Sequence, residues 1–140
     1  MAEEYALRIP AKKEGLVPIQ AFVCYLLDQA GCTGVARTQL RTAVEEIYVN
    51  QTLYAYPEGE GWVEIRGNAE NGEAAFTLID GGTPFDPLKV QDPDILLSGE
   101  ERPIGGLGIF MVRTLVDELA YEYRDGCNRL TMRKRLRDEQ

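Results

Sequence analysis

The stretch of sequence that decides the fold is GGLGIFMVRTLVDELAYEY, residues 105–123. It predicts an amphipathic helix over 108–123 that is preceded by Gly105, Gly106 and Gly108, although a glycine costs about 1 kcal/mol inside a helix. Bare backbone amides at a helix start form a favourable site for anions, and phosphate is the first candidate. The alternative is an ordinary loop that closes onto a helix, and the rest of the chain decides between the two.

The bulk composition predicts one domain, spanning residues 1–140. Of these residues 44% are hydrophobic, which suffices for one core. No stretch approaches the roughly 20 apolar residues of a membrane span, and the first residues do not resemble a signal peptide. The net charge of −8 opposes binding to nucleic acid. We therefore expect neither nucleic acid nor a membrane as a partner.

The cysteine and histidine content narrows the chemistry further. Three cysteines without metal-binding spacing favour reduced thiols, so the expected location is cytoplasmic. Histidine is absent, which excludes Ser-His-Asp and Cys-His catalysis within this chain, as well as an autophosphorylated histidine.

Periodicity and turn residues predict the order of the elements. They indicate a strand at 5–11, helices at 15–31 and 36–56, hairpin strands at 62–70 and 73–82, a long loop at 83–105, the helix at 108–123 and a strand at 128–136. This order favours an α+β fold, a two-layer sandwich of one sheet with its helices on one face. A loop as long as 83–105 is typical of a functional lid or of a disordered segment.

The predicted second helix carries the first candidate cluster. Glu46 and Asn50 are four residues apart and share one helix face. Their oxygens suit Mg²⁺, which usually keeps phosphates and waters at its other positions. Alternatively, the carboxylate orients an attacking hydroxyl or accepts its proton. Two solvated polar residues on an amphipathic helix are the plain interpretation, and Glu45 is expected to point elsewhere.

The second and third clusters surround the long loop. Asp80 ends an apolar strand and is followed by Gly81 and Gly82, which suits either an ordinary turn or a buried acceptor for the exocyclic amine of adenine. A guanine carbonyl would leave such an acceptor unpaired. Arg102 lies just before the glycine run, either as a surface residue or as a cover for a terminal phosphate.

Taken in order, these clusters resemble the Bergerat-fold (GHKL) ATPases, the superfamily of gyrase, heat-shock chaperones, histidine kinases and mismatch-repair ATPases. The short single-domain form is similar to the bacterial anti-sigma-factor serine/threonine kinases. The motifs that carry the similarity are EEIYVNQTLYAY (45–56), DGGTPFDPL (80–88) and GGLGIFMVRTLVDELAYEY (105–123). The resemblance covers residues 5 to 136 and implies a Bergerat fold with a mixed sheet, ATP and Mg²⁺.

The resemblance also implies a role for each matching residue at the phosphate end. Asn50 would hold Mg²⁺, Glu46 would be the base or the water-orienting group, and Arg102 would reach the terminal phosphate. The phosphates would bind to the glycine run, that is to Gly105, Gly106, Leu107 and Gly108.

At the base end the resemblance implies three further contacts. Asp80 would bind the adenine amine, Gly82 would pack beneath the ring, and Thr131 would support Asp80 or a water molecule. Two positions depart from the family pattern: Pro84 replaces the second glycine of its box, and Ile104 replaces the arginine expected directly before the glycine run. The first departure bears on the hinge of the loop and the second on the contact of Arg102.

Two functions follow as expectations. The first is an ATP-dependent protein serine/threonine kinase and anti-sigma factor, which phosphorylates an anti-anti-sigma (STAS-type) protein and forms a possible homodimer. The second is a nucleotide-gated binding switch that transfers no phosphate. A domain that binds no nucleotide is the weakest alternative, and the sequence identifies neither the sigma factor nor the pathway.

Overall fold

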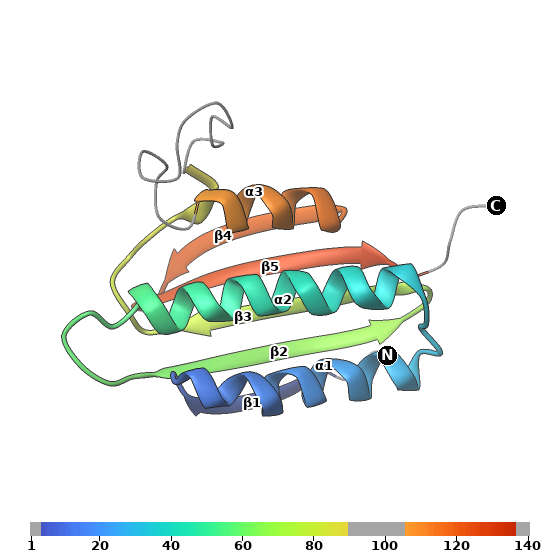
Figure 1. The fold of residues 1–140 in the computed structure, drawn as a ribbon, viewed down its shortest axis with the longest axis horizontal. Helices are drawn as coiled ribbons and strands as arrows, with labels where there is room; N and C mark the ends of the chain where they lie inside the picture. Colours follow the sequence, from blue (N-terminus) through green and yellow to red (C-terminus); the bar gives the residue numbers. More distant parts are fainter. Residues whose placement is uncertain (1–3, 90–105, 137–140) are drawn as a thin grey trace.

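The computed structural model describes residues 4–89 and 106–136. It contains two layers, a curved β-sheet and a layer of helices (Figure 1). Along the chain the elements are β1 (Tyr5–Pro10), the 3-10 turn η1 (Lys13–Gly15), α1 (Leu16–Gln29), α2 (Val35–Tyr54), β2 (Trp62–Glu70), β3 (Glu73–Asp80), the 3-10 turn η2 (Pro87–Lys89), α3 (Gly106–Leu115), β4 (Glu118–Arg124) and β5 (Cys127–Arg135).

The described strands form one sheet in the order β1-β2-β3-β5-β4, and every neighbouring pair is antiparallel. The α+β class and the two layers were predicted, but the expectation of a mixed sheet was wrong. β3 and β4 run in the same direction on either side of a helical connection, as parallel strands do. However, β5 inserts between them and pairs with both, so no parallel neighbours arise.

Two tight turns set the register of the sheet. Asn71 and Gly72 have φ of 56° and 78°, and Asp125 and Gly126 have φ of 56° and 76°. Positive φ at both central residues is the type I′ geometry that matches the twist of a hairpin. The first turn confirms the predicted hairpin.

The second hairpin was not predicted, and it corrects the helix expected over 108–123. α3 ends at Leu115, and the chain continues as β4 from Glu118. Leu119 and Tyr121 suit a helical period as well as a strand period, and pairing of the whole segment with β5 selects the strand.

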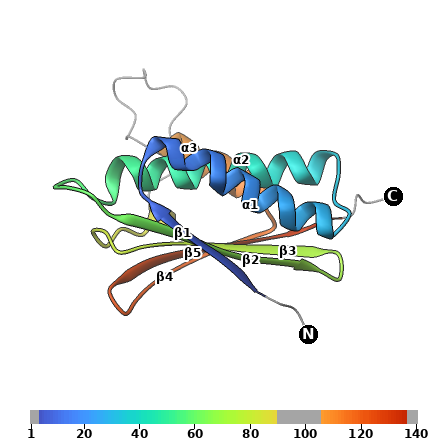
Figure 2. The ribbon, with the colours of Figure 1, turned by 90° about the horizontal axis from the view of Figure 1, so that it is seen from below.

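All three helices cover the same face of the sheet (Figure 2). α2 lies across its middle and packs between α1 and α3. The core between the layers consists of apolar side chains from both, among them Leu40, Val44, Ile65, Phe76, Leu78 and Met132. Within the described part of the chain, no helix combines the length and the apolar character that crossing a bilayer requires.

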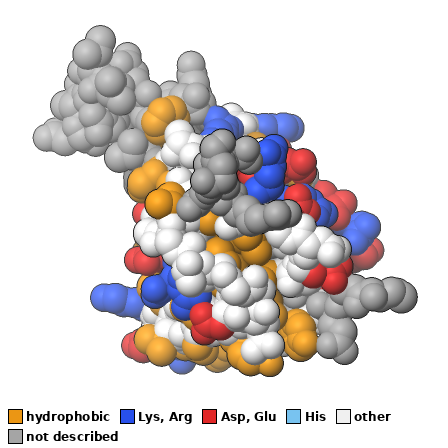
Figure 3. Space-filling view, turned by 90° about the vertical axis from the view of Figure 1, so that its right-hand side faces the viewer, with side chains coloured by type: hydrophobic (Ala, Val, Ile, Leu, Met, Phe, Trp, Pro, Cys, Tyr) orange, Lys and Arg blue, Asp and Glu red, His pale blue; other side chains and the backbone are white. Residues whose placement is uncertain are grey.

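The other face of the sheet carries charges. In Figure 3 positive and negative side chains alternate along the right-hand side of the molecule, away from the helices. Glu64 is the most buried of them and lies between Arg8 and Arg66. Burial alone would raise the pKa of Glu64, but hydrogen bonds from the two arginines outweigh it and hold that pKa below its ordinary value of 4.5.

Candidate functional site

A cavity of about 430 Å³ lies between the helix layer and the sheet. Its walls come from segments far apart in the sequence, chiefly α2, the end of β3 with the residues 83–87 that follow it, and β5, with single residues from α3 and β4. Most of the lining is apolar, with polar groups at few points, which is the composition of a small-molecule site. The apolar lining includes Ile47, Leu78, Phe85, Ile109 and Leu130.

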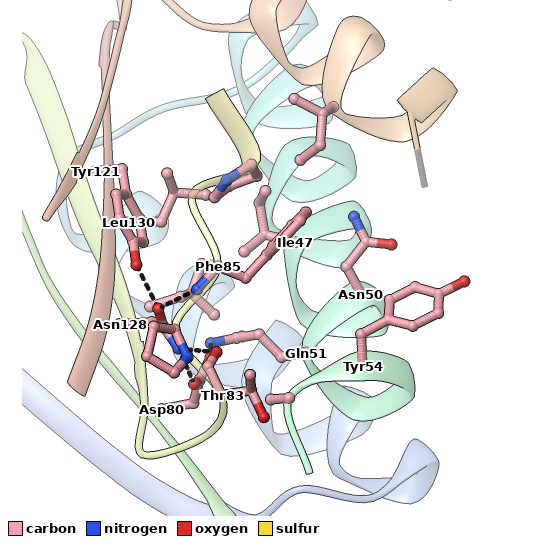
Figure 4. A pocket seen from close by; sticks show the side chains of 15 residues that line it. Ile47, Asn50, Gln51, Tyr54, Asp80, Thr83, Phe85, Tyr121, Asn128 and Leu130 are labelled. Carbon is pink, nitrogen blue, oxygen red and sulfur yellow. Dashed lines mark hydrogen bonds between the residues drawn. The ribbon is translucent and has the colours of Figure 1, made fainter. Parts of the chain in front are cut away.

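Asn50 and Asp80 both line this cavity. Asn50 lies in the C-terminal half of α2, and Asp80 is the last residue of β3. Figure 4 shows Asp80 together with Asn128 and Gln51, while Asn50 stands apart on α2. A nucleotide with its base at Asp80 and its metal at Asn50 requires this convergence.

Asp80 is only 4% exposed and sits in a dense hydrogen-bond network. Its Oδ1 accepts from the Gly82 backbone N–H (3.0 Å) and from Asn128 Nδ2 (2.9 Å), and its Oδ2 accepts from Gln51 Nε2 (2.9 Å). A carboxylate offers about four acceptor positions. One position therefore remains, on Oδ2.

Gly82 lies beside the cavity and meets α2 rather than the space predicted for a ring. A Cβ at Gly82 would fall 2.1 Å from the carbonyl oxygen of Ala55, so only glycine allows this approach. The next residue continues the contact, since the Thr83 N–H donates to the same carbonyl at 2.9 Å. The glycine thus lets the end of β3 join the end of α2.

Beside the cavity, where α2 packs on α3, Glu46 and Asn50 lie close to Gly108, and of these three residues only Asn50 is part of the cavity lining. A Cβ at Gly108 would lie 2.8 Å from Glu46 Oε2 and 3.9 Å from Asn50 Nδ2. Gly106 and Leu107 open α3 directly before it, and the first backbone amides of a helix have no partner within the helix. Glu45 is exposed, as the helix periodicity predicted.

Residues 90–105 of the predicted lid, which include Arg102 and Gly105, lie outside the described residues. The described part, residues 83–89, is held by hydrogen bonds. The Phe85 N–H donates to Asn128 Oδ1 (3.0 Å), and Arg113 donates to the Leu88 carbonyl (2.6 Å). The segment around Pro84 is therefore a fixed wall of the cavity.

The structure places Thr131 away from Asp80. Its hydroxyl pairs with that of Thr77 at 2.9 Å, on the charged face of the sheet. Side chains alternate between the faces of a strand, so Thr131 and Asn128 point in opposite directions. Asn128, directly opposite Asp80 in the β3–β5 register, supports the carboxylate instead.

Asn128 is the main functional residue that the sequence analysis missed. Its Nδ2 donates to Asp80 and to the Thr83 carbonyl, while its Oδ1 accepts from the Phe85 N–H and the Tyr121 hydroxyl. Burial raises the pKa of Tyr121, which keeps this hydroxyl a donor. The Asp-Gly turn at 125–126 was a signal for the β4–β5 hairpin, but the residue opposite Asp80 depends on the β3–β5 register, which this turn does not set.

Gln51 was also missed, although α2 carried a signal for it. Leu40, Val44 and Ile47 repeat at helical spacing, and Gln51 continues this stripe onto the buried face. The side chain is 9% exposed and lines the cavity beside Asp80.

The oxygen donors of Asn50 and Glu46 are too few to bind a hard cation alone, and they fit one only if phosphate supplies further ligands. Among residues 4–89 and 106–136 no group of three or more His, Cys, Asp or Glu side chains could hold a metal. Asn50 offers one amide oxygen and Glu46 a carboxylate close by, which matches the few protein ligands that Mg²⁺ takes beside substrate phosphates and waters.

Comparison with known families agrees with this geometry. The profile of the histidine kinase-like ATPase domain matches residues 9–134. The chain therefore belongs to the histidine kinase-like ATPase family. The resemblance predicted from the motifs is thereby confirmed.

Two curated proteins and one solved structure are similar to this chain over nearly all of its length. The serine-protein kinase RsbW of Listeria monocytogenes is 26% identical over 100% of this chain and 92% of its own length. The serine-protein kinase RsbW of Bacillus thuringiensis is 27% identical over 99% of this chain and 88% of its own. The crystal structure of the RsbU and RsbW domains of Rv1364c from Mycobacterium tuberculosis shares the fold, with a TM-score of 0.69 at 15% identity. That likeness covers 99% of this chain and 34% of the larger protein.

Proposed function

We propose that this protein is an ATP-dependent protein serine/threonine kinase that acts as an anti-sigma factor and phosphorylates a STAS-type anti-anti-sigma protein. The observation that carries the proposal is the convergence of Asp80 and Asn50 on one cavity of about 430 Å³. The similarity to proteins named serine-protein kinase, over 92% and 88% of their lengths, supports it.

The base end of the cavity favours adenine. The free acceptor position on Asp80 Oδ2 suits an exocyclic amine, and Ile47, Leu78 and Leu130 provide an apolar lining for a flat ring. A purine with a carbonyl at the same place would leave the buried carboxylate facing another acceptor, at a cost of about 1–3 kcal/mol.

The other end favours phosphates and their metal. Asn50 would hold Mg²⁺, and the amides at the start of α3 would bind phosphate oxygens, which this helix end attracts. Mg²⁺, when bound with ATP, neutralises charge on the phosphates during transfer. Glu46 is positioned to orient the acceptor hydroxyl of the partner protein or to take its proton.

The alternative is a nucleotide-gated binding switch without phosphotransfer. Its support is Pro84 in the wall of the cavity and the displacement of Arg102 from the glycine run. Positioning alone supplies much of the rate of phosphoryl transfer, so loss of one positioning group would leave nucleotide binding intact and chemistry slow.

A sigma factor and a STAS-type protein are the partners that the family resemblance implies, and a cytoplasmic location goes with them. The outer face of α1 supports the proposal of a homodimer, because it exposes apolar side chains. Leu16 to Leu27 carry no charged side chain, and Val17 and Tyr25 are 76% and 54% exposed. Tyr5 of the edge strand β1 packs edge-to-face on Tyr25 and extends this apolar surface.

The test combines binding and transfer. The protein is incubated with γ-labelled ATP, Mg²⁺ and each STAS-domain protein of its own genome, and label on the partner is measured beside equilibrium binding of Mg·ATP. Binding together with labelling supports the kinase, binding without labelling supports the switch, and absence of binding contradicts both.

Two variants assign the roles. Asn50→Ala should abolish the metal dependence of nucleotide binding, and Glu46→Gln should reduce labelling far more than binding. Glu45→Gln, the same change at the exposed neighbouring position, is the matched control and should alter neither. Normal Mg·ATP binding by Asn50→Ala would contradict the metal assignment.

A further inference from the structure

We propose that Gln51 reads the purine base beside Asp80, by donating a hydrogen bond to the ring nitrogen next to the exocyclic amine, N1 of adenine. This rests on the proposed function, in which the base binds at Asp80. It makes Gln51 a specificity-determining residue of the site.

The orientation of the Gln51 amide follows from its neighbour. Asp80 is an acceptor, so the group within 2.9 Å of its Oδ2 must be the donor nitrogen of Gln51. The amide plane is therefore fixed, with Nε2 next to the one Asp80 oxygen that has an acceptor position left.

The side-chain amide of Gln51 has hydrogen-bonding groups without a partner among the described residues. A primary amide carries two N–H groups, and within the described residues only one of those on Gln51 Nε2 has an acceptor. Its Oε1 is buried without a hydrogen-bond partner there. Buried polar groups are normally paired, and this side chain is 9% exposed at the cavity wall, so its second N–H is a free donor that a ligand in the cavity can use.

The edge of adenine complements this pair of residues. Asp80 Oδ2 presents an acceptor and Gln51 Nε2 a donor, 2.9 Å apart. Adenine presents a donor and an acceptor side by side, the amine hydrogen and N1. Guanine and hypoxanthine present a carbonyl and an N–H in these places. The acceptor Asp80 Oδ2 would then face the carbonyl oxygen, and the donor Gln51 Nε2 would face the N–H. Paired reading of this type discriminates more strongly than a single contact.

A purely supporting role for Gln51 predicts a different behaviour. If the amide only braced Asp80, its loss would weaken recognition of the amine equally for every base that carries one. Direct reading of N1 instead predicts a loss confined to bases that have this nitrogen.

The experiment compares ATP with 1-deaza-ATP, in which a C–H replaces N1 and the amine is retained. Equilibrium dissociation constants with Mg²⁺ are measured for the unaltered protein, for Gln51→Met and for Gln39→Met. Methionine keeps the length and flexibility of the side chain without its donor. Gln39→Met is the matched control, because Gln39 lies on the same helix and does not line the cavity.

For the unaltered protein and for Gln39→Met we expect ATP to bind about tenfold more tightly than 1-deaza-ATP, the equivalent of one buried hydrogen bond. In Gln51→Met the affinity for ATP should fall about tenfold while that for 1-deaza-ATP stays the same, so that the ratio approaches one.

Equal affinities of the unaltered protein for the two nucleotides would overturn the proposal, and this result needs no variant to fold. A tenfold ratio that survives in Gln51→Met would overturn it as well, because another group would then contact N1. In both cases ATP still binds and the proposed function stands. If the unaltered protein bound no ATP at all, the proposed function would fail together with this inference.

Discussion

The two ends of the cavity differ in how completely their polar groups are paired. At the base end, Asp80 accepts hydrogen bonds from Gly82, Gln51 and Asn128. At the phosphate end, no hydrogen bond joins the side chain of Glu46 or Asn50 to another described residue.

The difference indicates a division of labour. Under the proposed function, the paired groups of the base end are in place before the nucleotide binds, and we expect their residues to affect both selectivity and stability. We expect the unpaired groups of the phosphate end to contact charged groups of the ligand, so changes there should affect binding and chemistry more than the fold.

Asp80→Ala should have the largest effect, because it acts on both binding and stability. It removes the base acceptor and leaves the buried donors of Gln51 and Asn128 unpaired. We expect Mg·ATP affinity to fall about 100-fold and the free energy of unfolding to drop by about 3 kcal/mol. Isothermal titration and chemical denaturation measure the two, and unchanged ATP affinity in a folded variant would remove Asp80 from the base site.

Asn128→Ala should weaken the base end without removing its acceptor. Asp80 and the Thr83 carbonyl lose a donor, and the Phe85 N–H loses its acceptor. The free energy of unfolding should fall by about 2 kcal/mol, and the preference for ATP over ITP should shrink. Thr77→Ala, on the other face of the same sheet, is the control; equal loss of preference in both variants would contradict the role of Asn128.

Gly108→Ala tests the phosphate end, where binding and stability should separate. A Cβ there lies 2.8 Å from Glu46 Oε2, the mobile end of a flexible side chain, so Glu46 moves and the fold adapts. Alanine favours the helix over glycine by about 1 kcal/mol, and the melting temperature should hold or rise. Mg·ATP affinity should fall about tenfold if the crowded corner holds phosphate. Unchanged affinity would place the phosphates elsewhere.

Glu64→Gln should have the smallest effect, since it lies on the charged face away from the cavity. Because the pKa of Glu64 is lowered in the folded protein, its contribution to stability is present above pH 4.5 and is lost as the pH falls through the lowered pKa. Arg8 and Arg66 are 56% and 39% exposed, so solvent screening limits the contribution to about 0.5 kcal/mol. The difference in unfolding free energy between pH 7 and pH 3 should therefore be smaller in the variant by about 0.5 kcal/mol, with nucleotide binding unaltered. A variant that keeps the full acid sensitivity of the parent would contradict this assignment.

Local patterns in the sequence were enough to predict much of this molecule. The Asn71-Gly72 turn, the stripes of α1 and α2 and the position of Asp80 at a strand end are all local signals, and the structure follows them. Asn50 and Asp80 line one cavity because the end of β3 joins the end of α2, a tertiary contact that no local pattern specifies.

The failures in the sheet concern strand pairing, namely the β4–β5 hairpin and the register between β3 and β5. The residues 118–124 read as helix until β5 pairs with them, and the insertion of β5 between β3 and β4 makes the sheet antiparallel. The same register places Asn128 opposite Asp80 and turns Thr131 to the other face. Family motifs pointed to the right strand but not to the right residue on it.

The most direct test of the account is a crystal structure of the protein grown with Mg²⁺ and a non-hydrolysable ATP analogue. We predict one nucleotide in the cavity, with the adenine amine hydrogen-bonded to Asp80 Oδ2, N1 facing Gln51 and the metal on the Asn50 amide. A nucleotide bound with its base away from Asp80, or with its metal held by residues other than Asn50, would contradict the claim that the two ends form a single site.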